Sequence, residues 1–338
     1  MKRAGLLAAD VGGTKTDIAL GDCVQGRLHI RYRQRYASAA YADLDGLVED
    51  FLREAAEHGY EARGGHACLA VAGPVQGGRA TLTNLPWRID ATVFAPRHGL
   101  GGARVVNDFE AVGYGIAHLA DSETLVLQSG VVEMDGTRAV IGAGTGLGVA
   151  WLTAGPEGYR VHPTEGGHVD FAPADALQDE LLARLRHDYG HVSYERLLSG
   201  SGLVRIFQFL MESGRGLPTT AFEAALEQED DAASVISSLA LAGRDPLALQ
   251  ALDLFVAIYG AYAGSLALAT LPRGGLYVAG GIAPRIAEKL KAGSFMAAFR
   301  AKGRFEALLA SIPVAVVMNP AVGLYGAFEL AARLAGGR

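Results

Sequence analysis

The chain has 338 residues, 50% of them hydrophobic and 20% charged, a composition that can fill a substantial core and excludes a mainly disordered protein. Thirty basic against 36 acidic residues give a formal net charge of −6, so no overall basic excess favours nucleic-acid binding. Two cysteines, Cys23 and Cys68, exclude a disulfide framework, and we expect either to be a small buried hydrophobe rather than a nucleophile. The length is typical of two domains or of one large domain.

Two apolar runs resemble membrane-directed segments. The first ten residues mimic a signal peptide, but their apolar run is short and stops at Asp10. Leu254–Leu271 carries no charge and just reaches membrane-spanning length, yet it is rich in Ala and Gly. We interpret it as a tightly packed core helix and expect a cytoplasmic protein with no membrane partner.

Strands and helices alternate along the first half of the chain. Strand–turn–strand units are predicted at Leu6–Val11 with Thr16–Leu20, around Gly12-Gly13, and at Arg138–Gly142 with Leu147–Leu152, around Gly144-Thr145-Gly146. Between them the patterns predict a helix at Tyr41–Gly59, strands at Ala67–Ala72 and Arg104–Asn107, and a helix at Phe109–Leu119. The alternation predicts an α/β architecture, and the two units suggest a duplication with one glycine turn in each half.

The second half is predicted to be mostly helical from Asp175 to Leu271, with an acidic, exposed break at Glu227–Asp231. Strands at Leu276–Ala279 and Val314–Val317 and a closing helix at Gly323–Leu334 follow.

The two glycine turns are candidate phosphate sites, because backbone N–H groups approach an anion closely where no Cβ intervenes. Gly12, Gly13, Thr14 and Lys15 follow Asp10, whose carboxylate suits coordination of Mg²⁺ through water. Either turn alone is better explained as an ordinary hairpin, whereas two matching turns, one of them beside an Asp, favour phosphate. Neither GxxxxGK[ST] nor GxGxxG occurs, so the sequence does not favour a P-loop or a Rossmann site.

Three further polar segments can carry chemistry. Asn107-Asp108 ends a strand, where the carboxylate can accept a hydroxyl proton or the pair can cap a helix. Glu165 and His168 flank two glycines and can read adjacent hydroxyls, or belong to an ordinary surface loop. Glu195 follows Ser193 in the first turn of a predicted helix, where it favours the helix dipole. Trp87 is either a core aromatic or part of a lid.

Together these segments resemble the bacterial glucokinases, most closely the proteobacterial-type ATP-dependent group. The resemblance covers roughly residues 5–330 and rests on segments in the family's order: Asp10–Thr14, Asn107-Asp108, Gly144–Gly148, Glu165–Phe171, Glu195 with Leu197–Gly202, and Ala279–Ile282. Lys15 stands where the family usually has Asn. No cysteine follows Cys68, which places the chain outside the zinc-bearing branch of the related repressor–kinase–ORF family.

The resemblance implies an actin-like, ribonuclease H-like two-domain kinase fold with ATP in an interdomain cleft. The domains would be residues 1–118 plus 319–338, a small α/β domain, and residues 119–318, a large one. It also implies ATP- and Mg²⁺-dependent phosphorylation of D-glucose at its 6-hydroxyl by a homodimer.

The same resemblance implies roles for individual residues. Asp108 would be the catalytic base. The sugar would be bound by Asn84, Asn107, Asp108, Gly146, Glu165, His168 and Glu195. The nucleotide would be bound by Asp10, Gly12, Gly13, Thr14, Lys15, Gly144, Thr145, Gly280, Gly281 and Gly323, with Asp10 reaching Mg²⁺ through water.

Two alternatives remain open. One is a kinase for another hexose or for an N-acetylated amino sugar. The other is a non-catalytic sugar-sensing regulator, which the early strand at Leu6 disfavours because it leaves no room for an N-terminal helix-turn-helix.

Overall fold

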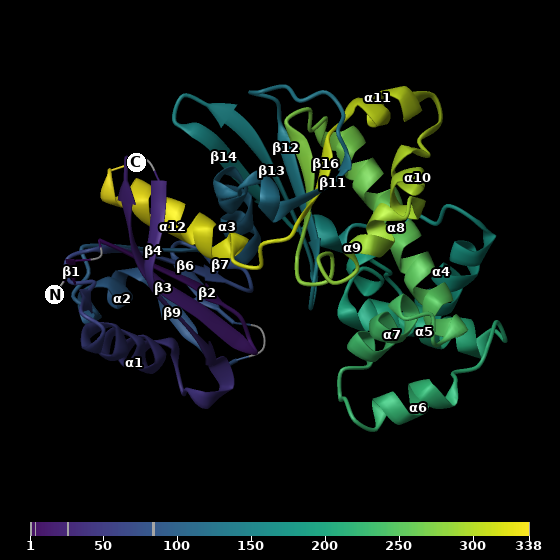
Figure 1. Ribbon diagram of the computed structural model, residues 1–338, viewed down its shortest axis with the longest axis horizontal. Helices are drawn as coiled ribbons and strands as arrows, with labels where there is room; N and C mark the ends of the chain where they lie inside the picture. The colour runs from purple at the N-terminus through teal and green to yellow at the C-terminus, as the bar shows by residue number, and fades with distance from the viewer. Residues whose placement is uncertain (1, 4, 26, 83–84, 338) are drawn as a thin grey trace. The chain divides into compact units, whose positions relative to one another are not determined.

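The computed structural model describes residues 2–3, 5–25, 27–82 and 85–337, and the chain folds into two compact units (Figure 1). The first unit comprises Met1–Asp121, Tyr159–Pro163 and Asn319–Arg338, and the second comprises Ser122–Gly158 and Thr164–Met318. Each unit has its own hydrophobic core, built against one main sheet.

The main sheet of the first unit has the order β10-β6-β2-β3-β4. Its strands are β2 (Leu6–Val11), β3 (Lys15–Val24), β4 (Arg27–Ala37), β6 (His66–Val71) and β10 (Gly102–Asn107). β2, β6 and β10 are parallel, whereas β3 is antiparallel to both β2 and β4. The carboxyl ends of the three parallel strands therefore meet at one edge, where Val71 pairs in register with Val11 and with Asn107.

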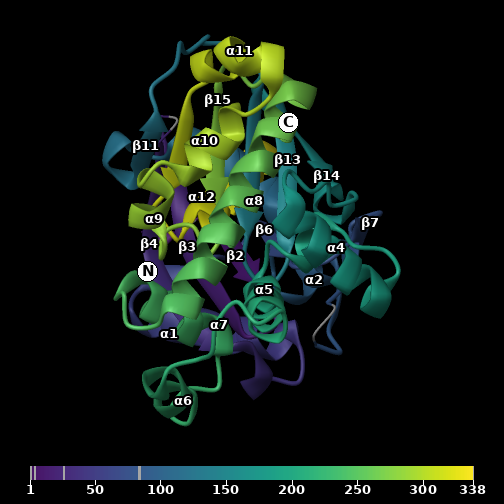
Figure 2. The same cartoon turned by 90° about the vertical axis from the view of Figure 1, so that its right-hand side faces the viewer.

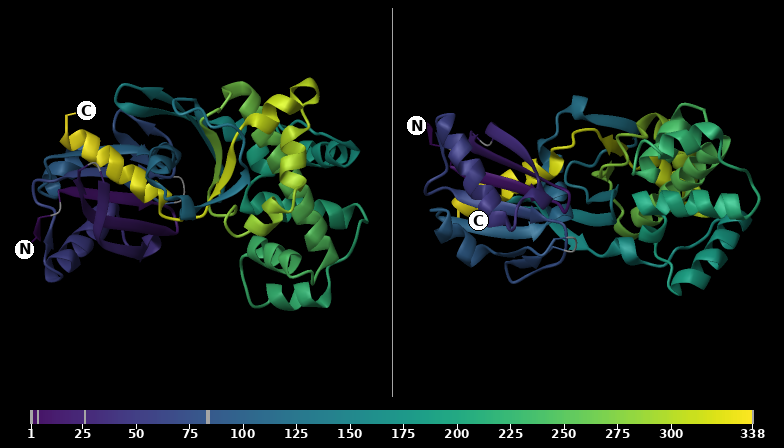
Figure 3. Two further views of the ribbon diagram at one scale, coloured as in Figure 1. Left: turned by 45° about the horizontal axis from the view of Figure 1, so that its top comes forward. Right: turned by 90° about the horizontal axis from the view of Figure 1, so that it is seen from below.

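Two helices pack closely beside this sheet. They are α3 (Asp108–Gly115) and α12 (Val322–Ala335), and α12 also contacts β2 and β6. Figure 3 shows α12, in yellow, beside the purple strands of this sheet. Glycine makes the approach possible, because a Cβ on Gly115 would lie 1.9 Å from the Val322 carbonyl oxygen and one on Gly326 would lie 1.7 Å from that of Ala111. The other elements are β1 (Lys2–Arg3), η1 (Ser38–Ala40), α1 (Leu44–Glu57), β5 (Tyr60–Glu61), β7 (Val75–Gln76), β8 (Arg79–Thr81), β9 (Arg88–Asp90), α2 (Ala91–Arg97) and η2 (Ile116–His118).

The six-stranded sheet has the order β11-β16-β15-β12-β13-β14, and its strands belong to the second unit except for Tyr159–Pro163 of β14. The strands are β11 (Thr124–Gln128), β12 (Arg138–Ala143), β13 (Leu147–Gly155), β14 (Gly158–Thr164), β15 (Gly275–Ala279) and β16 (Val314–Val317). β12, β15 and β16 are parallel, and β13 returns antiparallel to β12. This repeats the arrangement of β10, β6, β2 and β3, so the predicted duplication of a glycine-turn hairpin is confirmed.

The helical half of the second unit centres on α8 (Pro246–Thr270), which Figure 2 shows in front of the sheet with α10 alongside. α8 is apolar and long enough to span a membrane, yet 72% of its most apolar stretch is buried, which supports its interpretation as a core helix. The remaining elements are η3 (Asp121–Glu123), η4 (Gly166–His168), α4 (Ala176–Tyr189), η5 (Tyr194–Arg196), α5 (Gly200–Glu212), α6 (Thr220–Leu226), α7 (Ala232–Leu241), α9 (Ala287–Lys291), α10 (Ser294–Arg300), η6 (Gly303–Phe305) and α11 (Glu306–Ser311).

Several predicted boundaries were wrong. The helix expected from Tyr41 begins at Leu44, because the Asp43 side chain accepts a hydrogen bond from the Gly46 N–H and caps it, and it ends before Gly59. The helix expected to reach Leu119 ends at Gly115 and continues as a single 3₁₀ turn.

The two cysteines and Trp87 have different surroundings. Cys68 is buried, as expected, but Cys23 is exposed near the end of β3. Trp87 is 1% exposed and is therefore a core residue rather than part of a lid.

Candidate active site

The carboxyl edge of the first sheet holds two carboxylates, Asp10 and Asp108. Asp10 lies near the end of β2, and Asp108 opens α3 directly after β10. Burial and the negative charge of Asp108 raise the pKa of Asp10 to about 7. Gly323 in α12 lies beside it, since a Cβ there would lie 3.1 Å from Asp10 Oδ2. This edge therefore carries negative charge that a bound cation would stabilise.

The first glycine turn is held by a serine. The Gly12 N–H donates to the Lys15 carbonyl at 3.0 Å and closes the turn between β2 and β3. The buried Ser38 hydroxyl donates to the Gly12 carbonyl at 2.7 Å, and the Ser38 N–H donates to the Thr14 carbonyl at 3.0 Å. Thr14 and Lys15 are exposed at the tip, so the turn presents a hydroxyl and an ammonium group on a fixed backbone.

Asn107 and Asp108 combine a structural and a chemical role. The Asn107 side chain accepts the Phe109 N–H at 2.9 Å and caps α3, while its amide nitrogen donates to the Gly73 carbonyl at 3.2 Å. The same Phe109 N–H lies 2.9 Å from Asp108 Oδ1. The half-buried carboxylate is therefore oriented at a helix N-terminus, where the helix dipole stabilises its ionised form.

The second glycine turn lies at the matching edge of the second sheet. The Gly144 N–H donates to the Gly146 carbonyl at 2.8 Å, and the Gly144 carbonyl accepts the first N–H of α5, from Gly200, at 2.9 Å. Gly280 has φ +82° and follows β15; a Cβ on it would lie 2.4 Å from the Ala143 carbonyl oxygen. Gly280 and Gly281 therefore pack against the base of this turn, and a side chain at Gly280 would displace it.

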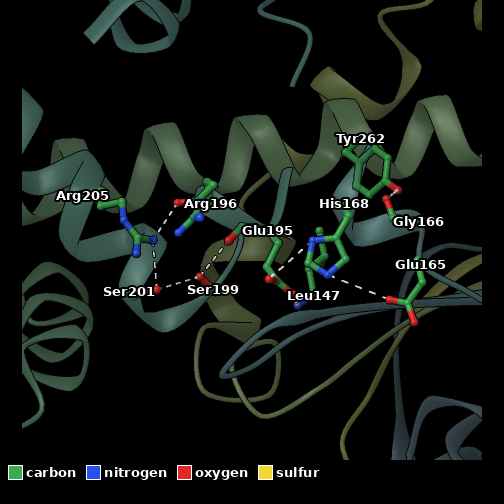
Figure 4. Close-up of polar contacts among 10 residues, drawn as sticks. All are labelled: Leu147, Glu165, Gly166, His168, Glu195, Arg196, Ser199, Ser201, Arg205 and Tyr262. Carbon is green, nitrogen blue, oxygen red and sulfur yellow. Dashed lines mark hydrogen bonds and ion pairs between the residues drawn. The ribbon is translucent and has the colours of Figure 1, made fainter. Parts of the chain in front are cut away.

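Three polar side chains gather beside this turn, as Figure 4 shows. His168 Nε2 lies 3.9 Å from Glu165 Oε2, and His168 Nδ1 lies 3.8 Å from Glu195 Oε1. Glu195 Oε2 accepts the Leu147 N–H at 2.9 Å. The side chains of Glu165, His168 and Glu195 are 80%, 57% and 33% exposed, so most of their hydrogen-bonding capacity is open to a polyhydroxylated ligand.

The segments that carry these side chains are joined to one another. The Tyr194 N–H donates to the Val169 carbonyl at 3.0 Å, and Asp170 forms a bridge with Ser193. Glu195 lies in the single 3₁₀ turn η5, where the Ser193 side chain makes no capping bond. The interpretation of Glu195 as a helix-dipole residue was therefore wrong, since its carboxylate accepts the first N–H of β13 instead.

The structure thus forms two groups of predicted residues, each within one unit. The first unit holds Asp10, Gly12, Gly13, Thr14, Lys15, Asn107, Asp108 and Gly323, and the second holds Gly144, Thr145, Gly146, Glu165, His168, Glu195, Gly280 and Gly281. Asn84 lies outside the described residues. Within those residues, no three His, Cys, Asp or Glu side chains form a cluster that could hold a metal ion.

Sequence reasoning missed the residues that support the site. Ser38 holds the first glycine turn. In the second unit, two tyrosines of α8 bond backbone atoms beside the site: the Tyr259 hydroxyl accepts the Ala143 N–H at 3.1 Å, and the Tyr262 hydroxyl donates to the Gly166 carbonyl. A serine after a strand and tyrosines in an apolar helix carry no functional signal in the sequence.

Comparisons with known proteins show the family of this chain. The family model "Glucokinase" matches residues 7–334. A glucokinase of Nostoc sp. is 43% identical, and the alignment covers 97% of this chain and 99% of that protein. The crystal structure of a glucokinase from an Antarctic psychrotroph superimposes with a TM-score of 0.79 at 29% identity, covering 98% and 99% of the two chains. A ROK family glucokinase from Streptomyces griseus in complex with glucose and AMPPNP shares the fold, with a TM-score of 0.65 at 22% identity over 97% and 99%.

Proposed function

This chain belongs to the glucokinase family of ATP-dependent sugar kinases and has an actin-like ATPase fold, and from this we propose that its two groups of site residues act on one pair of substrates. The reaction is transfer of the γ-phosphate of ATP to the 6-hydroxyl of D-glucose, giving glucose 6-phosphate and ADP. The observation that carries this proposal is the cluster of Glu165, His168 and Glu195 next to the Gly144–Gly146 turn, which combines ligands for a polyol with a site for phosphate.

Asp108 acts as the base. Its carboxylate accepts the proton of the 6-hydroxyl as that oxygen bonds the γ-phosphorus and the bond to the β-phosphate oxygen breaks. Phosphoryl transfer requires alignment and charge stabilisation more than covalent help, and the capped N-terminus of α3 supplies a fixed orientation. Asn107, on the same capped turn, binds the sugar beside it.

Most of the proposed sugar-binding residues lie in the second unit. Glu165, His168 and Glu195 accept and donate hydrogen bonds to ring hydroxyls, and the backbone at Gly146 contacts the ring. Asn84 is proposed as a further sugar ligand on the family resemblance alone. A site whose polar groups pair with each hydroxyl rejects an analogue that leaves one group unpaired, at about 1–3 kcal/mol for each.

The two glycine turns bind the nucleotide. Gly12, Gly13 and Thr14, with the Lys15 ammonium, face the phosphates from the first unit; the donors are the N–H groups of Gly13 and Thr14, because the Gly12 N–H closes the turn. Gly144 and Thr145 face them from the second unit; the donor is the Thr145 N–H, because the Gly144 N–H bonds the Gly146 carbonyl. Gly280, Gly281 and Gly323 flank the nucleoside. At the glycines of each turn, no Cβ would keep a bound phosphate away from the backbone.

Asp10 fits a water-mediated Mg²⁺ site. Its carboxylate has a raised pKa because it is buried near a second carboxylate, and a divalent cation would stabilise its ionised form. Bound Mg²⁺ neutralises phosphate charge in such reactions. Asp10 would hold the ion, while Asp108 keeps its role as proton acceptor.

Further parts of the proposal concern the whole protein. We place the functional domains at residues 1–118 with 319–338 and at residues 119–318, and we propose a cytoplasmic homodimer.

A coupled assay of ADP release across hexoses tests the function. Glucose should give a kcat/KM well above those of mannose, fructose, galactose and N-acetylglucosamine, and phosphate should appear at its 6-position by NMR. A higher kcat/KM for one of the other sugars would reassign the substrate. No ADP release with any sugar, together with sugar-sensitive DNA binding, would favour a regulator instead.

A further inference from the structure

Tyr262 connects the long core helix to the sugar-binding turn. It lies in the middle of α8 and is buried, and its hydroxyl donates a hydrogen bond to the carbonyl of Gly166 (Figure 4). Gly166 lies between Glu165 and His168 in the turn η4. A core residue therefore bonds the backbone of a turn whose side chains are exposed.

The ring of Tyr262 is fixed by a second tyrosine. It stacks on Tyr194, with ring centroids 4.0 Å apart and an interplanar angle of 15°. Tyr194 precedes Glu195 directly, and its ring also meets Phe171 edge-on at 5.5 Å. The stacked pair thus contacts both segments that bear sugar-binding side chains.

Short-range hydrogen bonds hold the turn. The His168 N–H donates to Glu165 O at 3.0 Å, and the Gly166 N–H donates to Thr164 Oγ1 at 3.0 Å. The Gly166 carbonyl accepts the Val169 N–H at 3.4 Å as well as the Tyr262 hydroxyl. On its inner side Gly167 packs on β13, where a Cβ would lie 2.0 Å from the Leu147 carbonyl oxygen. Leu147 is also the residue whose N–H bonds Glu195, so a shift of the turn would disturb all three sugar-binding side chains.

The donor state of Tyr262 is stable. Burial raises the pKa of its hydroxyl to about 12, so it stays protonated across the range in which the protein is folded and active.

We propose that Tyr262 is a positioning residue for the sugar: its hydroxyl, oriented by the stack on Tyr194, holds the Gly166 carbonyl and thereby fixes Glu165 and His168 for hydroxyl recognition. This inference rests on the proposed function, because it assigns to Tyr262 a role in glucose binding and none in phosphate transfer.

Tyr262→Phe tests it, because the variant keeps the stacked ring and removes only the hydroxyl. The glucose KM should rise about 3- to 10-fold, the factor expected for one lost hydrogen bond, with kcat and the ATP KM changed less than about twofold. Tyr36→Phe is the matched control: it removes a tyrosine hydroxyl that donates to Glu54 Oε2 at 2.8 Å in the first unit, so its glucose KM should stay at the wild-type value.

A double-mutant cycle with His168→Ala separates positioning from general loosening. If Tyr262 acts through the turn, adding Tyr262→Phe to His168→Ala should raise the glucose KM by a smaller factor than it does alone. Full additivity would overturn the inference, and so would an unchanged glucose KM or a fall in kcat that parallels a loss of Tm.

Hydrogen exchange gives a readout that does not need turnover. In Tyr262→Phe the amides of residues 166–169 should exchange faster, while those in the middle of α8 remain protected; unchanged exchange in the turn would also overturn the inference. If the wild type fails to phosphorylate glucose, the proposed function is wrong. An active wild type with an unaffected Tyr262→Phe would overturn only the positioning role.

Discussion

Gly146 lies directly against the carboxylate of Glu195: a Cβ built on Gly146 would lie 2.6 Å from Glu195 Oε2. Gly146→Ala should therefore push the carboxylate away from the Leu147 N–H. Because Glu195 is partly exposed, the protein should fold normally and the glucose KM should rise at least tenfold. Steady-state kinetics and calorimetric glucose titration check this. Gly155→Ala is the control, since its Cβ would meet only ordinary contact at 3.5 Å and the KM should stay unchanged.

Asp108→Asn should lower kcat by about 10²- to 10⁴-fold, the usual contribution of a general base. The amide keeps the size of the side chain but cannot accept the proton, so glucose affinity should change little. Single-turnover kinetics and equilibrium glucose binding separate the two effects. A normal kcat with only a raised glucose KM would remove Asp108 from the base role.

Asp10→Asn should inactivate the enzyme and yet stabilise the metal-free protein. The raised pKa of Asp10, about 7 in the folded chain, means that the folded state binds more protons than the unfolded state from about pH 4 to 7. Stability from this group is therefore lost as pH rises through that window. At pH 8 in EDTA, thermal unfolding should show a higher Tm for the variant than for the wild type.

Asp17→Asn is the matched control, because its effect on Tm should have the opposite sign. Burial alone would raise the pKa of Asp17. Arg33 donates to both of its carboxylate oxygens at 2.7 Å and Arg35 donates to one of them, and these hydrogen bonds outweigh burial and lower the pKa below its usual value. Removing this carboxylate deprives both guanidinium groups of their partner at an almost buried position, where the Asp17 side chain is 11% exposed, so its Tm should fall. A lower Tm for Asp10→Asn as well would contradict the predicted cost of the Asp10 charge.

Glu329 should make the protein acid-sensitive. Hydrogen bonds from His118, at 3.1 Å, and from Arg333, at 2.7 Å, outweigh the effect of burial and lower the pKa of Glu329 to about 2. The stabilisation is present above the unfolded pKa and is lost as pH falls from about 4.5 to 2. Urea unfolding of Glu329→Gln should show roughly 1–3 kcal/mol less stability at pH 7. Its curve between pH 5 and 3 should be flatter than that of the wild type; parallel curves would refute the assignment.

The hairpins were predictable, whereas their supporting contacts were not. Apolar runs interrupted by Gly12-Gly13 and by Gly144–Gly146 predict strand, turn and strand from local sequence alone. β4 was not predicted, although its residues alternate between half-buried and exposed as in a half-buried strand. Its charged residues are explained only by the neighbouring strand β3, where Arg31 pairs with Asp22 and Arg33 and Arg35 pair with Asp17.

The site, too, could be predicted only in part from the sequence. Motifs in the sequence predicted Glu165, His168 and Glu195 as site residues, but not that His168 lies between the two glutamates or that a bridge between Asp170 and Ser193 joins their segments. Ser38 and Tyr262 act through backbone carbonyls of Gly12 and Gly166. A bond to a backbone atom leaves no residue-type pattern in the sequence, so these supports required the tertiary structure.

The close packing of α12 against α3, where Gly115 meets Val322 and Gly326 meets Ala111, has a consequence for biosynthesis. The sheet of the first unit leaves the ribosome long before α12, the helix that covers it. The face of β2 and β6 that α12 covers therefore stays exposed while the helical half of the second unit is translated. Until α12 has been synthesised, this apolar face therefore leaves the nascent protein prone to aggregation.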